Sequence, residues 1–150
     1  MTWTARRYDS CNFDGVLEET RVLVADDDPL LLATVADALT LAGATVTRAA
    51  SGAELIEQLG NEGPFDLVVT DISMPWMNGL QAMQAVRTAG LGTPVIVMTA
   101  LADERLPSQI RALGENALLL RKPFDRAQLV AAASTLLARR PTGSVSRTPP

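Results

Sequence analysis

The sequence predicts an α/β fold in which a doubly wound, five-stranded parallel sheet carries helices on both faces. Five short apolar runs alternate with five segments of helical periodicity along the chain, which is the element order of a parallel sheet. The run at 22–25 is apolar at every position, as expected of a strand buried on both faces. Because crossovers between parallel strands are right-handed, the helices are expected on both faces of the sheet.

The first strand is predicted over residues 22–25, where an apolar run ends at three consecutive aspartates, Asp26 to Asp28. Asp28 can cap the following helix, because a carboxylate at that position accepts free N–H groups of the first turn, and Pro29 suits the first helical position. Apolar residues then recur at helical spacing until Gly43, which is typical of a helix end.

The same strand–helix unit then repeats, with turn residues such as those of 60–64 between the elements. Pro107 falls inside one helical segment, and a proline in a helix interior costs about 3 kcal/mol. We therefore expect that helix to be short, displaced or to begin near Pro107. The further strands are expected over 44–49, 65–70, 95–98 and 117–120, and the further helices over 51–59, 79–89, 102–113 and 125–138.

Residues 21–140 are expected to form the domain. Residues 1–20 show no sustained periodicity and are expected to be an extension that is mobile or loosely docked. Residues 141–150 contain glycine, serine, threonine and three prolines, a composition that predicts a disordered tail.

Composition excludes several classes of function. The chain of 150 residues has a net charge of −4, with 13 basic and 17 acidic side chains, which argues against binding nucleic acid by phosphate neutralisation. It has one cysteine and no histidine, so an internal disulfide and a zinc site of the Cys/His type are excluded. No apolar run reaches the ~18 residues that span a bilayer, and no apolar block follows Arg6 and Arg7 as in a secretory signal. We expect a cytoplasmic protein that does not associate with membranes.

Polar side chains stand where four of the predicted strands end. They are Asp26 with Asp27, then Asp71, Thr99 and Lys122, and parallel strands bring their carboxyl ends to one edge of a sheet, where ligands bind. Carboxylates held close together repel one another unless a cation intervenes. Magnesium is the natural candidate because it accepts one or two carboxylates and keeps water ligands. The plainer alternative is that Asp26 to Asp28 only cap a helix.

Lys122 is the single lysine beside twelve arginines. An ammonium suits one anionic oxygen, whereas the planar guanidinium suits bidentate pairing; the alternative is that one lysine is left over by drift of composition. Magnesium, an ammonium and a hydroxyl together serve a phosphoryl group best. Since an aspartate can itself be the nucleophile, the central Asp71 is the candidate acceptor and Asp26 and Asp27 the metal-holding pair.

Four motifs resemble the receiver domains of two-component response regulators. They are VLVADDDP at 22–29, TDISMPWMNG at 70–79, MTA at 98–100 and KPF at 122–124, and the resemblance covers residues 21–138. It implies a flavodoxin-like sheet in the order 2-1-3-4-5. It also implies that Asp26, Asp27, Asp71 and the backbone carbonyl of Ser73 bind Mg²⁺, that Asp71 is the phosphoacceptor, and that Thr99 is the switch hydroxyl beside the site lysine, Lys122.

The resemblance implies a single-domain response regulator, since only the tail follows residue 140. It would accept phosphoryl from the phosphohistidine of a sensor histidine kinase or a histidine phosphotransfer protein, and would then act on a downstream protein target as a monomer or weak homodimer. It would be no enzyme beyond its own Mg²⁺-dependent phosphorylation and dephosphorylation. The short fourth helix expected here is similar to that of receiver domains in hybrid sensor kinases.

Two alternatives remain open on the residues. One is a phosphatase of the haloacid-dehalogenase type with Asp26 as nucleophile, because Asp26 and Asp28 match the nucleophile pattern of that family. Leu30 stands where that family has threonine or valine, and its late acidic pair is missing here. The other is a degenerate receiver that binds constitutively, which the intact acidic residues disfavour.

The last strand departs from the family pattern. Family members usually carry an aromatic residue three places before the lysine, where this chain has Leu119, so we predict that no threonine-coupled ring rotation occurs. The stretch from Gly114 to Lys122 is one residue longer than usual, which leaves the register of the strand open. The bond between Lys122 and Pro123 corresponds to one that is cis in the family.

Overall fold

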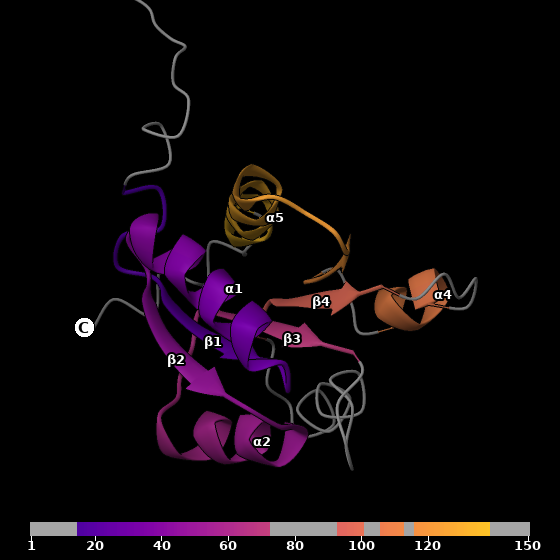
Figure 1. Cartoon of the computed structure of the whole chain (residues 1–150), viewed down its shortest axis with the longest axis horizontal. Coiled ribbons are helices and arrows are strands. Elements are labelled where there is room, and N and C mark those ends of the chain that lie inside the picture. The colour runs from indigo at the N-terminus through magenta and orange to yellow at the C-terminus, as the bar shows by residue number, and fades with distance from the viewer. Residues whose placement is uncertain (1–14, 73–92, 101–105, 113–115, 139–150) are drawn as a thin grey trace, which may run out of the picture.

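The computed structural model describes residues 15–72, 93–100, 106–112 and 116–138. Its five strands form one sheet in the order β2-β1-β3-β4-β5, with every neighbouring pair parallel (Figure 1). The predicted fold class and strand order are therefore confirmed. The strands are β1 (Arg21–Ala25), β2 (Thr45–Ala49), β3 (Leu67–Asp71), β4 (Val95–Thr99) and β5 (Ala117–Arg121).

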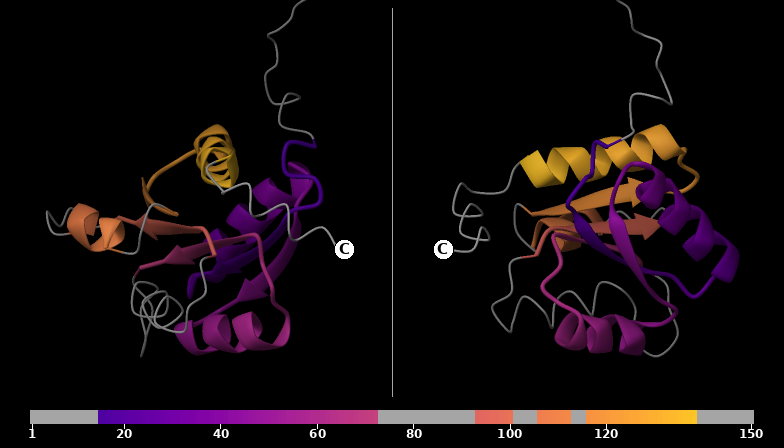
Figure 2. Two further views of the ribbon diagram at one scale, coloured as in Figure 1. Left: turned by 180° about the vertical axis from the view of Figure 1, so that it is seen from behind. Right: turned by 90° about the vertical axis from the view of Figure 1, so that its left-hand side faces the viewer.

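Helices cover both faces of the sheet, as the right-handed crossovers require (Figure 2). One face packs against α1 (Pro29–Leu41) and α5 (Arg126–Ala138), and the other against α2 (Gly52–Asn61) and α4 (Leu106–Arg111). The helix expected over 79–89 lies outside the described residues.

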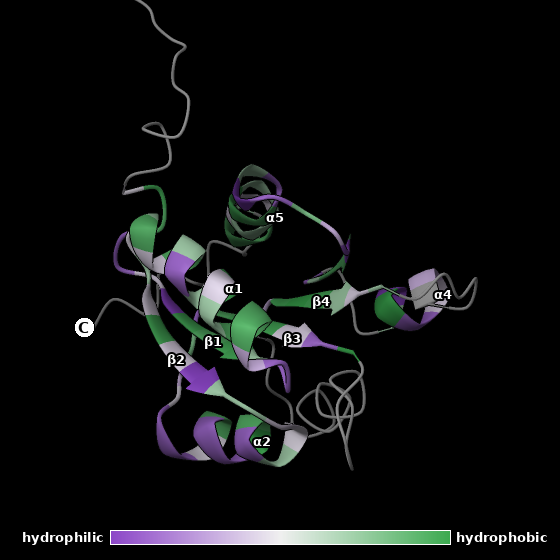
Figure 3. Cartoon of the chain, viewed as in Figure 1, coloured by the Kyte–Doolittle hydropathy of each residue, from purple (hydrophilic) through white to green (hydrophobic). Residues whose placement is uncertain are grey.

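The central strands are buried on both faces, which explains their continuous apolar runs. In β1, Val22 and Val24 contribute to the core under α1 and α5, while Leu23 and Ala25 contribute to the core under α2 and α4. All four are fully buried. Successive side chains of a strand point to opposite faces, so a strand between two helical layers needs an apolar residue at each position. Figure 3 shows β1 and β4 mostly in the colour of apolar residues.

Local capping sets the bounds of α1 as the sequence predicts. The Asp28 carboxylate accepts a hydrogen bond from the Leu30 N–H at 3.0 Å, and Pro29 is the first helical residue. Just beyond the helix, Gly43 adopts a φ of 109°, a left-handed conformation that glycine accepts without the clash of a Cβ atom.

The structure describes part of the fourth helix and the register of β5. The described part of the fourth helix begins at Leu106, so Pro107 lies in the first turn, where its missing N–H removes no intrahelical bond. Because the residues just before Leu106 are not described, the expectation that the helix begins near Pro107 stays a prediction. The β5 register pairs Val95 with Ala117 and Thr99 with Arg121, so Lys122 directly follows the last pair. Residues 102–105 and 113 lie outside the described part.

The structure corrects the expectation for the last residues of the N-terminal extension. Leu17 is only 1% exposed, and its N–H donates to the carbonyl of Ala42 at 2.8 Å. Two apolar residues, Val16 and Leu17, are too few to give a periodicity, so the burial of Leu17 could not be foreseen. Residues 1–14 and the tail at 141–150 lie outside the described residues.

Candidate functional site

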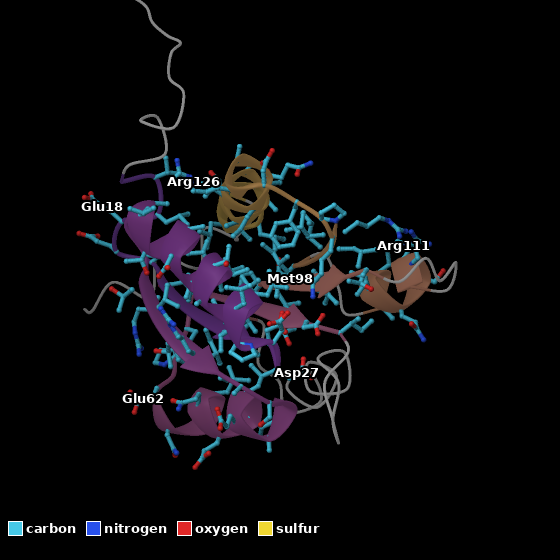
Figure 4. The ribbon with its side chains drawn as sticks, viewed as in Figure 1. Glu18, Asp27, Glu62, Met98, Arg111 and Arg126 are labelled. Atoms are coloured by element: carbon cyan, nitrogen blue, oxygen red, sulfur yellow. The ribbon has the colours of Figure 1, made fainter. Side chains whose placement is uncertain are left out.

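The polar residues at the strand ends meet at one edge of the sheet. Asp26 follows β1, Asp71 is the last residue of β3, and Thr99 is the last residue of β4. Lys122 follows β5 and donates its backbone N–H to the carbonyl of Thr99 at 2.7 Å. In Figure 4 the labelled Asp27 lies at this edge, near the tips of the central strands.

Three carboxylates and one ammonium form the centre of the site. Asp26, Asp27 and Asp71 each offer an oxygen, and these oxygens lie within 4.8 Å of one another. The Nζ of Lys122 lies 3.1 Å from Oδ1 of Asp71 and 3.6 Å from Oδ2 of Asp26. The predicted grouping of these four side chains is thus confirmed by distance.

The site is buried on one side and open on the other. Asp26 is 1% exposed and Asp71 5%, while Asp27 is exposed. The side chain of Lys122 keeps 21% of its surface. Among the described residues, Asp27 and Lys122 therefore form the exposed side of the site.

Of the three carboxylates, that of Asp26 has the least favourable environment for a negative charge. Its Oδ1 accepts the N–H of Asp28 at 2.9 Å, but its Oδ2 is buried and accepts no hydrogen bond from the described residues. Burial raises the pKa of Asp26, and the charges of Asp71 and Asp27 raise it further. The N–H of Asp28 and the ammonium of Lys122 lower the pKa, but the net direction is upward. Sequence reasoning missed this use of the Asp28 N–H, because it depends on the path of the turn.

The residues present fit a magnesium ion. A buried carboxylate oxygen without a donor, grouped with two other carboxylates, is the arrangement that a hard divalent cation relieves. Asp26, Asp27 and Asp71 would hold it, and Mg²⁺ keeps water on the positions that the protein does not fill. Ser73, whose carbonyl the resemblance assigns to the metal, lies outside the described residues.

Thr99 is completely buried at the end of β4. Met98, the residue before Thr99, pairs with Asp71 between β4 and β3. Thr99 therefore lies one residue beyond the strand partner of Asp71. Thr70, the residue before Asp71, donates its hydroxyl to the backbone carbonyl of Asp71 at 3.1 Å. Thr99 therefore stands at the edge where the sequence places it.

Asp28 does not belong to the cluster, which weakens the phosphatase alternative. Its carboxylate caps α1 by accepting from the N–H groups of Leu30 and Leu31, and it is exposed. Asp28 therefore caps the helix, which is the role that the plainer alternative gave to all three aspartates, Asp26 to Asp28. For Asp26 that reading is wrong, because its carboxylate lies beside Asp71 and Lys122 instead of capping the helix.

The β5 strand shows an aliphatic residue at the expected aromatic position. Leu119 is half-buried and packs against the core cluster that contains Val97 and Ile110. No ring is therefore present at this strand position to rotate inward. The peptide bond between Lys122 and Pro123 is cis, as the resemblance implies.

Comparisons with known proteins agree with this geometry. The family model for the response regulator receiver domain matches residues 22–134. The chain is 37% identical over 135 residues to the transcriptional regulatory protein PrrA of Mycobacterium tuberculosis, covering 89% of this chain and 56% of that protein. It is 38% identical over 111 residues to the DNA-binding transcriptional regulator NtrC of Escherichia coli, covering 73% and 23%. The chain thus spans about half the length of the first relative and less of the second.

Solved structures give the same picture. The response regulator receiver protein from Sinorhizobium medicae WSM419 superposes with a TM-score of 0.74 at 35% identity, covering 83% of this chain and 99% of that one. The receiver domain of the Francisella response regulator 1452 gives a TM-score of 0.73 at 27% identity, covering 81% and 98%. Among the described residues, no helix has both the length and the apolar character needed to cross a bilayer.

Proposed function

The chain belongs to the family of response regulator receiver domains, and from this premise we propose that it accepts a phosphoryl group on Asp71 from a partner's phosphohistidine. The observation that carries the proposal is the position of the Lys122 ammonium, 3.1 Å from Oδ1 of Asp71, with the oxygens of Asp26 and Asp27 within 4.8 Å of an Asp71 oxygen. An acceptor carboxylate, a cation and a set of metal ligands thus share one open edge.

In the proposed transfer, a carboxylate oxygen of Asp71 attacks the phosphorus of the partner's phosphohistidine. The new O–P bond forms as the N–P bond breaks, and the imidazole leaves with the bonding electron pair. These 150 residues contain no histidine, which supports a phosphohistidine on a partner protein as the donor. Mg²⁺, when bound, supplies positive charge to the phosphoryl oxygens.

Side chains of the protein position the phosphoryl group and neutralise its charge. Lys122 keeps its ammonium beside Asp71 and can move to a phosphoryl oxygen once the Asp71 carboxylate has become an acyl phosphate. We infer that the buried hydroxyl of Thr99 donates to another phosphoryl oxygen, which its place beside Asp71's strand partner supports. Asp26 and Asp27 hold the metal. Hydrolysis by water would return Asp71 to the free carboxylate, and we propose no other enzymatic activity for this domain.

Receiver domains interact with histidine kinases and with downstream effectors. We propose that this one takes phosphoryl from a sensor histidine kinase or a histidine phosphotransfer protein in the cytoplasm, and passes the signal on by contact with a protein as a monomer or weak homodimer. The net charge of −4 supports a protein target over nucleic acid for this domain. PrrA and NtrC carry names of transcriptional regulators, so a single-domain regulator stays a prediction.

The test is intact-protein and peptide mass spectrometry after incubation with acetyl phosphate and Mg²⁺. The wild type should gain the mass of one phosphoryl group, and Asp71→Asn should gain none. Glu57→Gln is the matched control, because it removes one negative charge from the exposed surface of α2 and should leave phosphorylation unchanged. Omitting Mg²⁺ should abolish the label. Label on Asp26 would instead favour the phosphatase.

A further inference from the structure

Six described residues, 15–20, precede β1 and lie before residue 22, where the family match begins, and yet they are part of the folded domain. We propose that this segment, which we call the strap, fastens the C-terminal end of α1 to the sheet and contributes to the stability of the whole domain. The inference is independent of the proposed phosphoryl transfer, because it concerns the end of α1 that is remote from the acidic site.

Leu17 anchors the strap in the core. It is 1% exposed and belongs to the same buried cluster as Leu39 of α1 and Leu136 of α5, so it lies where the two helices pack over the sheet. Its N–H also donates to the carbonyl of Ala42 at 2.8 Å. The last carbonyls of a helix have no intrahelical partner. The strap therefore supplies a donor that the end of α1 otherwise lacks.

Backbone hydrogen bonds continue the strap into the sheet. The N–H of Thr20 donates to the carbonyl of Leu17 at 3.1 Å, which closes a tight turn, and the N–H of Thr45 donates to the carbonyl of Thr20 at 2.9 Å. The last bond belongs to the first step of the pairing of β1 with β2, where Arg21 lies opposite Thr45. The strap is thus joined to α1 on one side and to an edge strand on the other.

Two backbone features show that the strap is closely fitted. A Cβ atom at Gly43, whose φ is +109°, would lie 3.1 Å from the backbone nitrogen of Glu18 and 3.3 Å from its Cα, closer than most Cβ contacts. Glu19 adopts a φ of 62°, a left-handed conformation that costs a non-glycine residue energy and persists where surrounding contacts impose it. Glycine at 43 is what allows the close approach.

The strap and the acidic site lie at opposite ends of α1. Figure 4 shows the labelled Glu18 at one end of this helix and Asp27 at the other, and 13 residues of helix span roughly 20 Å. The strap therefore lies away from Asp71. The strap should determine stability without taking part in phosphorylation.

Thermal unfolding of the full chain tests the strap. Leu17→Ala should lower the melting temperature by about 6–12 °C, because it empties a fully buried leucine site. The matched control is Val16→Ala, the neighbouring residue, which is 43% exposed and should shift it by less than about 2 °C. The extent of labelling by acetyl phosphate, measured well below both transitions, should be equal in all three proteins. Equal melting of Leu17→Ala and wild type would overturn the proposal.

Hydrogen exchange of the wild type gives a second test that needs no variant. The amides of Leu17 and Thr20 should exchange as slowly as those of β1, since both are hydrogen-bonded and held by the core. Exchange at the rate of an exposed loop would show that the strap opens freely, and would refute the proposal even if Leu17→Ala failed to fold.

Discussion

Replacing Asp26 with asparagine should make the metal-free domain more stable, and the distances show why. Attraction across the 3.6 Å between Oδ2 and the Lys122 Nζ is about 5 kcal/mol at an effective dielectric constant of 20. Repulsion from an Asp71 oxygen within 4.8 Å is at least about 3.5 kcal/mol on the same scale. These two contributions nearly offset each other, and exposed Asp27 adds further repulsion.

The burial of Asp26 then decides whether the substitution stabilises or destabilises the domain. An ionised carboxylate withdrawn from water loses several kcal/mol of hydration, and Oδ2 receives no hydrogen bond from the described residues in return. Asparagine keeps an oxygen that can accept the N–H of Asp28, and Lys122 keeps its contact with Asp71. We expect a net gain of about 1 kcal/mol, or a rise of about 3–6 °C in melting temperature.

The pH dependence has a definite sign. Because the pKa of Asp26 is raised in the folded state above its ordinary value of 3.8, the folded protein holds this proton more tightly than the unfolded chain. Between 3.8 and the raised value, the contribution of Asp26 to stability increases as the pH falls. Above that window its charge is a full cost. The advantage of Asp26→Asn should therefore be largest near neutral pH and shrink on acidification.

Thermal unfolding in EDTA and in excess Mg²⁺ provides the assay. The variant should melt above the wild type in EDTA. Mg²⁺ at 100 times its dissociation constant stabilises the wild type by about 2.7 kcal/mol, and the variant, which lacks one ligand, should gain much less, so the order should reverse. Glu57→Gln, with the same change of charge on the surface, should move with the wild type. A variant that melts below the wild type in EDTA would refute the electrostatic reasoning.

Three further substitutions separate chemistry from architecture. Lys122→Gln should reduce phosphorylation by acetyl phosphate at least tenfold, measured as initial rate by mass spectrometry, because the ammonium 3.1 Å from Asp71 is lost. Asp28→Ala should lower unfolding free energy by about 0.5–2 kcal/mol in urea while phosphorylation persists, since this carboxylate only caps α1. Arg21→Ala should cost about 1–3 kcal/mol in the same assay, because its guanidinium donates to two loop carbonyls at 2.7 and 2.6 Å; unchanged stability would show that water replaces both bonds.

The order of the elements and the location of the site were predictable from sequence. The run before Asp26 and the one before Asp71 identify buried strands, because a parallel sheet leaves few other uses for such runs. The cap at Asp28 and the helix end at Gly43 also follow from neighbours within a few residues. Given parallel strands, the meeting of the aspartates with Lys122 is a consequence of topology.

Tertiary structure alone decided which groups are buried and which are paired. Lys122 meets Asp71 across 51 positions of sequence, and the unmatched oxygen of Asp26 depends on the exact path of three strand ends. Leu17 has one apolar neighbour in sequence, and only the assembled core shows that it is buried. Periodicity and capping arise from residues adjacent in the chain, and the sequence shows them directly. Burial and charge coupling depend on distances that exist only after the sheet has assembled.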